Sequence, residues 1–128
     1  MVSIVLLSHS PQIVEGLKQL IWEMAPLVPV YATGGTAEGT LGSDFIRIRK
    51  SLEDADNQDG TIVFFDLGSS LMTAEMALED LPDNISEKIT IADAPLVEGA
   101  LEAAVAAAGN SSVSDILKLL EKIKIGKL

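Results

Sequence analysis

Apolar and polar positions along the chain fall into blocks that predict strands and helices in turn. Four short apolar runs bounded by polar or turn-forming residues are typical of buried parallel strands, and they lie at residues 2–7, 28–32, 61–66 and 89–92. The third run is unbroken up to Phe65 and therefore belongs in the middle of a sheet. Pro29 has no N–H to donate, so the second strand starts there or lies at an edge.

Between the strands, apolar residues recur with the 3.6-residue period of helices. The predicted helices span residues 11–24, 45–55, 71–81 and 95–108, and a last one follows Ser112. Ser10 followed by Pro11, and Ser112 followed three residues later by Asp115, are typical of helix N-termini. The first helix is expected to cover the sheet with the stripe Ile13, Leu17, Leu20, Ile21 and Met24. Trp22 lies off this stripe, which favours packing or an oligomer contact, and the Met72/Met76 pair is expected to fill core space.

This alternation predicts an α/β fold with an open, mainly parallel four-stranded sheet and helices on both faces. With the strand order 2-1-3-4, the first and third strands are neighbours at the point where the order reverses. At 128 residues, we expect a single domain over residues 1–128.

Composition excludes several classes of function. The chain has no cysteine, which excludes disulfides and thiolate metal ligands, and no cluster of side chains predicts a metal site. The net charge of −10 argues against nucleic-acid binding, since Arg47, Arg49 and Lys50 form the only basic cluster. Neither a signal peptide nor a membrane span is predicted, so the cytoplasm is the expected location.

The candidate chemistry lies where the first and third strands end. His9, the only histidine, follows the first strand, and Asp66 ends the third. A neutral imidazole is a nucleophile toward phosphorus, and a carboxylate on one ring nitrogen fixes its tautomer while the other nitrogen attacks. Nearby hydroxyl and backbone N–H groups are the candidates for holding phosphoryl oxygens: Ser8, Ser10, Gly68, Ser69 and Ser70. Position alone also allows a structural histidine and a turn aspartate.

Residues 33–43 contain four glycines and predict a mobile loop. The interval from Gly34 to Gly39 matches a phosphate-cradling loop, but Thr40 stands where that motif has lysine. Nucleotide binding and a flexible wall beside the site are both open interpretations.

Three motifs together extend these inferences. They are Ile4–Ser10, Phe65–Ser70 with Ala74, Glu75, Ala77 and Leu78, and Ala94–Ala100. Over nearly the whole chain they resemble the phosphotransfer subunit of the bacterial phosphoenolpyruvate-dependent dihydroxyacetone kinase, which is similar to mannose-type EIIA domains of the phosphotransferase system.

The resemblance implies a phosphotransferase in which His9 is phosphorylated by phospho-HPr and Asp66 orients it. The phosphoryl group then passes to ADP in the nucleotide-binding kinase subunit, supporting the phosphorylation of dihydroxyacetone. ADP/ATP and magnesium are expected on that subunit, and no cofactor on this chain. Since the chain stops after one domain, free HPr is the expected donor. The resembled families also imply a homodimer.

The docking rim for the partner is predicted at residues that flank His9, namely Gly34, Gly35, Leu67, Leu71 and, if it does not fill the core, Met72. The alternatives are a mannose-type EIIA sugar-transport component, a histidine phosphatase and a non-catalytic flavodoxin-like scaffold. A phosphatase needs arginines around its phosphate, and the chain has only Arg47 and Arg49.

Overall fold

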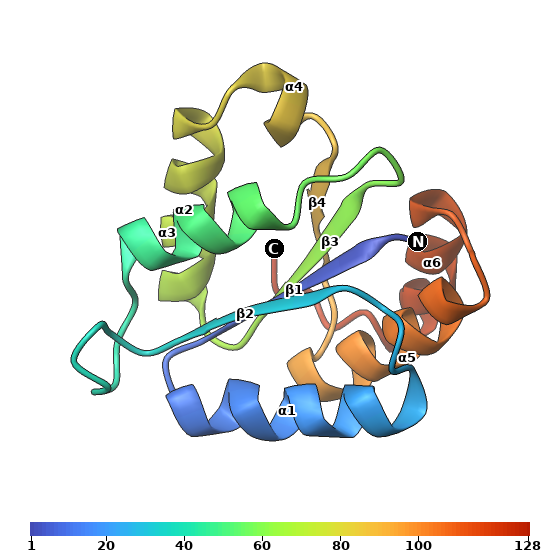
Figure 1. Cartoon of the computed structure of the whole chain (residues 1–128), viewed down its shortest axis with the longest axis horizontal. Coiled ribbons are helices and arrows are strands. Elements are labelled where there is room, and N and C mark those ends of the chain that lie inside the picture. The colour runs from blue at the N-terminus through green and yellow to red at the C-terminus, as the bar shows by residue number, and fades with distance from the viewer.

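The computed structural model describes residues 1–128, and strands and helices alternate through most of the chain (Figure 1). The elements are β1 (Ser3–Ser8), α1 (Pro11–Met24), β2 (Val30–Gly34), α2 (Phe45–Asp54), β3 (Thr61–Phe65), α3 (Gly68–Asp80), α4 (Asp83–Ser86), β4 (Ile89–Ile91), α5 (Leu96–Ala108), α6 (Val113–Leu120) and the 3₁₀ turn η1 (Glu121–Ile123). Only the two shortest helical pieces, α4 and η1, have no counterpart of their own in the sequence prediction.

The four strands form one parallel sheet in the order β2-β1-β3-β4, which confirms the predicted fold. Helices α1 and α5 cover one face of this sheet and α2 and α3 the other (Figure 1). β2 starts one residue after Pro29 and is an edge strand, so both expectations for this proline are met. No helix combines the length and the apolarity that a membrane crossing needs.

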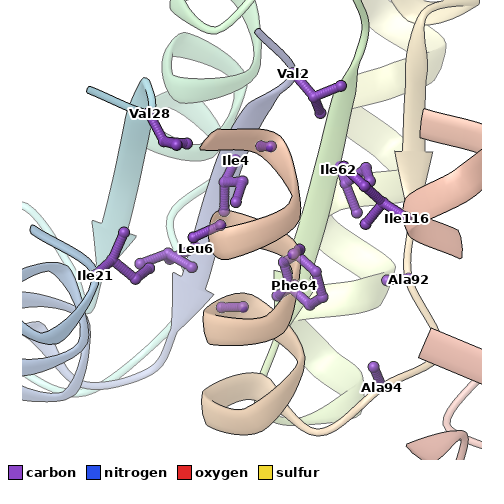
Figure 2. Close-up of a cluster of buried hydrophobic side chains, with 14 of the residues drawn as sticks. Val2, Ile4, Leu6, Ile21, Val28, Ile62, Phe64, Ala92, Ala94 and Ile116 are labelled. Atoms are coloured by element: carbon purple, nitrogen blue, oxygen red, sulfur yellow. The ribbon is translucent and has the colours of Figure 1, made fainter. Parts of the chain in front are cut away.

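Strand residues point alternately into two separate cores. Ile4 and Leu6 of β1 pack with Ile62 and Phe64 of β3 in the larger core, under α1, α5 and α6 (Figure 2). Their neighbours in sequence, Val5, Leu7, Val63 and Phe65, pack under α2 and α3 in the other core. β1 and β3 are therefore buried on both faces, and their ends hold the residues that follow them in fixed positions.

The predicted face of α1 is correct at Leu17 and Ile21 and wrong at its other three positions. The helix buries Val14, Leu17 and Ile21 against the sheet. Ile13, Leu20 and Met24 are about half exposed. Because α1 carries apolar residues on more than one side, its periodicity does not decide which stripe meets the sheet.

α3 also differs from its prediction. It begins at Gly68 rather than residue 71, with Leu67 as an N-cap that makes no side-chain hydrogen bond. Met72 and Met76 are exposed, so they do not fill the core as expected. Ala74, Ala77 and Leu81 supply the buried contacts instead.

Candidate functional site

His9 and Asp66 meet at the carboxyl ends of two adjacent strands. β1 and β3 pair in register up to Leu7 and Phe65, so the residues just beyond them lie side by side. His9 Nδ1 is 3.0 Å from Asp66 Oδ1. Since a carboxylate only accepts hydrogen bonds, Nδ1 carries the ring proton in the neutral imidazole. The contact therefore leaves the lone pair on Nε2.

Asp66 is held by donors on both of its oxygens. Oδ2 accepts from the Ser8 hydroxyl at 2.8 Å and from His9 N–H at 2.9 Å. Oδ1 accepts from Leu67 N–H at 2.7 Å as well as from the imidazole. Burial raises the pKa of Asp66, but these hydrogen bonds outweigh it and hold the pKa below its usual value. Asp66 is therefore ionised at neutral pH.

The other ring nitrogen faces the start of α3. His9 Nε2 lies 2.5 Å from the hydroxyl of Ser69, whose side chain is in the exposed first turn of the helix. With the lone pair on Nε2, the Ser69 hydroxyl donates to it. The imidazole is thus fixed at both nitrogens, and Nε2 is the one whose partner is a rotatable, exposed group.

The other serines near His9 make different hydrogen bonds from that of Ser69. The Ser8 hydroxyl is buried, donates to Asp66 and accepts from Ser10 N–H, while the Ser10 hydroxyl caps α1 by accepting from Ile13 N–H. Ser70 is also buried, with its hydroxyl 3.2 Å from His9 Nδ1. The Ser8 and Ser70 hydroxyls therefore contact the His9–Asp66 pair, whereas the Ser10 hydroxyl is used at the start of α1.

The glycine-rich loop begins inside the fold. Gly34 and Gly35 are buried, and a Cβ on Gly34 would lie 2.6 Å from the carbonyl oxygen of Ser10. Their prediction as docking residues is therefore wrong, since they allow the chain to pass close to the start of α1. Gly42 N–H donates to the His9 carbonyl, so the far end of the loop lies against the site.

The nucleotide-binding interpretation of this loop is not supported. In a phosphate-cradling loop, backbone N–H groups at a helix N-terminus bind the anion. Here the carboxylate of Asp44 caps α2 by accepting from Arg47 N–H. The Arg47 guanidinium donates to the carbonyls of Gly34 and Gly35 and so closes the base of the loop.

Both arginines have partners other than the imidazole. Arg47 binds the loop carbonyls, and Arg49 pairs with Asp80 and Glu53. A histidine phosphatase needs arginines around the phosphate. The structure therefore argues against this alternative.

Two of the predicted rim residues are exposed beside the site. Leu67 is 60% exposed and Met72 is 66% exposed. Leu71 packs against the core under α2 and α3 and is only partly accessible. Leu41, near the end of the loop, and Ile46, on α2, are further exposed apolar side chains.

One residue near the site, Lys127, is not predicted by any pattern in the sequence. Lys127 donates through Nζ to the carbonyl oxygen of Phe65, the residue before Asp66. Burial lowers its pKa below the usual value, although the charges of Asp66 and Asp93 raise it. Only the folded chain brings this lysine close, because 60 residues separate it from Asp66 in sequence.

Comparisons with known proteins identify the family of the chain. The EIIA-man family model, described as the PTS system fructose IIA component, matches residues 3–117. The chain belongs to the EIIA-man family. Its fold is shared by a solved protein of this size, EF1359, whose crystal structure is described as that of a protein of unknown function. The TM-score is 0.86 at 34% identity, covering 94% of this chain and 93% of that one.

Curated relatives of this EIIA-man chain carry a more specific name. A protein from Listeria innocua, 44% identical over 96% of this chain and 99% of its own length, is named the phosphoryl donor subunit DhaM of PEP-dependent dihydroxyacetone kinase 2. A Lactococcus lactis protein, 37% identical over 97% of both chains, is named the phosphotransferase subunit DhaM of a PTS-dependent dihydroxyacetone kinase. An Escherichia coli DhaM is 32% identical, and the match covers 26% of it.

Proposed function

We propose that this chain is a phosphohistidine carrier. His9 Nε2 takes a phosphoryl group from phospho-HPr and passes it to ADP bound in the nucleotide subunit of a dihydroxyacetone kinase. The observation that carries the proposal is the contact between Asp66 and His9 Nδ1, which leaves the lone pair of Nε2 for attack on phosphorus. The names of the Listeria and Lactococcus relatives support the choice of kinase.

The transfer needs no proton to move. The Nε2 lone pair forms a bond to phosphorus while the bond between phosphorus and the donor's nitrogen breaks, and that nitrogen keeps the electron pair. The imidazole of His9 gains positive charge as this happens. Asp66 stabilises that charge by accepting the hydrogen bond from Nδ1–H, whose nitrogen lies 3.0 Å from Oδ1.

The start of α3 supplies the groups for the phosphoryl oxygens. The Ser69 hydroxyl, now on Nε2, turns to donate to a phosphoryl oxygen once Nε2 is occupied. The first N–H groups of α3, from Gly68 onward, have no capping side chain because Leu67 occupies the N-cap. Uncapped N–H groups at a helix start stabilise negative charge.

The acceptor is expected to approach over the exposed apolar residues beside His9. Leu67 and Met72 lie on the α3 side of the site, and Leu41 belongs to the loop whose far end contacts His9. An apolar rim suits a brief contact that excludes water while the phosphoryl group passes from His9 Nε2 to an oxygen of ADP. ADP and magnesium belong to the partner subunit in this scheme, and the reaction takes place in the cytoplasm.

Labelling tests the proposal. We expect the chain to become labelled when incubated with radioactive phosphoenolpyruvate, enzyme I and HPr, and to lose the label on addition of ADP-loaded kinase subunit. His9→Gln is the control, because His9 lies beyond the end of β1 and its loss leaves the core intact. Label on His9→Gln would refute the assignment. Release of free phosphate would indicate a phosphatase, and no label a scaffold.

The same experiment separates the two phosphotransferase-system roles. A dihydroxyacetone kinase subunit gives its label to ADP and forms ATP. A sugar-transport component keeps its label when the ADP-loaded kinase subunit is added. ATP formation therefore supports the first role, and retention of label contradicts it.

The proposal includes a homodimer. α1 leaves Trp22 66% exposed, together with Leu20 and Met24 on the same helix. Exposed apolar side chains on one helix suit a two-fold interface. Sedimentation at tens of micromolar is expected to give twice the chain mass, and the mass of one chain would contradict the dimer.

A further inference from the structure

The C-terminal segment, residues 124–128, returns to the end of the sheet where the site lies. It follows η1, and in Figure 1 it leaves the helices at the right and ends beside β3. Lys127 N–H donates to Asp93 Oδ1 at 2.7 Å, which anchors the segment to the loop that follows β4. The Lys127 ammonium lies 4.1 Å from the centre of the Phe65 ring and donates to the Phe65 carbonyl.

This contact occupies a position that the sheet leaves open. Alternate carbonyls of a parallel strand point to the same side, and the Val63 carbonyl accepts from Ala92 N–H on the β4 side. The Phe65 carbonyl is the next one on that side, but the last β3–β4 pair is Val63 with Ile91. Lys127 therefore provides the donor where the ladder has ended, one residue before Asp66.

The ammonium also brings positive charge to a site that holds a carboxylate. Asp66 and Asp93 both interact with it electrostatically. The basic residues of α2 are used elsewhere: Arg47 binds loop carbonyls, Arg49 pairs with Asp80 and Glu53, and Lys50 pairs with Asp54. In a chain with a net charge of −10, Lys127 is thus placed to compensate negative charge near His9.

A phosphoryl group on His9 adds up to two negative charges beside the Asp66 carboxylate. We propose that Lys127 is a positioning residue of the transfer site. Its ammonium, held by the hydrogen bond to the Phe65 carbonyl, offsets this charge and so stabilises the phosphorylated state. The inference rests on the proposed phosphorylation of His9. This role of the C-terminal segment is separate from the role of His9 as nucleophile and from that of Asp66 as the orienting carboxylate.

Three variants test this role. Lys127→Met keeps an unbranched stem on the Phe65 ring and removes the charge, whereas Lys127→Arg keeps the charge. Lys124→Met removes a charge from the same segment at an exposed position and is the matched control. The measurement is the equilibrium of phosphoryl exchange between HPr and each chain, with thermal unfolding of each variant to verify the fold.

We expect Lys127→Met to shift the exchange about 3- to 10-fold toward phospho-HPr, the size of a Coulomb interaction at a partly exposed site. Lys127→Arg is expected within about twofold of the parent, and Lys124→Met to be unchanged. An unchanged equilibrium for Lys127→Met would overturn the inference. Equal shifts of the equilibrium in Lys127→Met and Lys127→Arg would also overturn it, because they would indicate that the side chain only anchors the segment. Equal shifts in Lys127→Met and Lys124→Met would overturn it as well, because they would indicate an effect of net charge. If Lys127→Met does not fold, Lys127→Gln replaces it as the variant without charge, with the same expected shift, and an unchanged equilibrium for Lys127→Gln would overturn the inference. A parent chain that takes no label would refute the carrier function itself.

Discussion

Replacing Asp66 by asparagine removes one charge and creates one hydrogen-bonding conflict. Both carboxylate oxygens accept from backbone N–H groups, Oδ2 from His9 and Oδ1 from Leu67. An asparagine amide has one oxygen, so in either orientation its NH₂ group faces one of these donors. An unsatisfied N–H costs about 1–3 kcal/mol, and we expect Asp66→Asn to lose stability of that size.

The same substitution slows phosphoryl transfer. The lost carboxylate is 3.0 Å from Nδ1, and opposite charges about 4 Å apart near a protein surface interact by about 4 kcal/mol. This corresponds to roughly 10³-fold in rate, within the range of about 10²- to 10⁴-fold for a positioned acid–base partner. If the amide NH₂ turns toward Nδ1, the ring proton moves to Nε2 and the nucleophilic lone pair is lost.

The assay is single-turnover transfer from phospho-HPr in a rapid-quench instrument, with chemical unfolding of the same samples. Asp83→Asn, which neutralises an exposed carboxylate on α4, is the control for charge and should match the parent.

The pH dependence of the free energy of unfolding is a second test of the Asp66 contacts. Because folding lowers the pKa of Asp66, its stabilisation is complete above the unfolded pKa and is lost as pH falls through the folded value. The stability difference between parent and variant is therefore expected to shrink in acid. Transfer at the parent rate with parent stability would refute the reasoning and make Asp66 a turn residue.

Two further substitutions test the rim and the loop. Met72→Lys is expected to raise the concentration of ADP-loaded kinase subunit needed for half-maximal transfer without lowering the maximal rate. Met76→Lys, one turn farther along α3 and 59% exposed, is the control, and a lowered maximal rate with unaltered half-saturation would contradict docking at Met72. Gly34→Ala is expected to destabilise the fold by about 1–3 kcal/mol, because its Cβ would lie 2.5 Å from Val14 Cγ2 and 2.6 Å from a backbone oxygen. Gly16→Ala meets no atom within 4 Å and should stabilise α1, and equal unfolding midpoints for the two variants would refute this packing argument.

The fold was predictable because its signals are local. Strand runs such as Thr61–Phe65 and the Ser10–Pro11 helix start depend on neighbours in sequence, and right-handed crossovers then restrict the strand order. The same logic predicts that His9 and Asp66 meet, since both follow strands that the order makes adjacent.

The details that sequence did not predict depend on tertiary packing. Ile13 and Val14 are equally suited to a core, and the sheet beside Gly34 decides that Val14 is buried. The direction of the Ser8 hydroxyl toward Asp66 follows from strand register rather than from residue type. Lys127 reaches the site through a chain reversal after η1 that no local pattern encodes.

The most direct test of the central claim is nitrogen-15 NMR of the histidine ring before and after incubation with phosphoenolpyruvate, enzyme I and HPr. We predict that the free protein shows the tautomer protonated at Nδ1, and that the phosphorylated protein shows phosphorus coupled to Nε2 of His9. Phosphorus on Nδ1, or on a residue other than His9, would contradict the account.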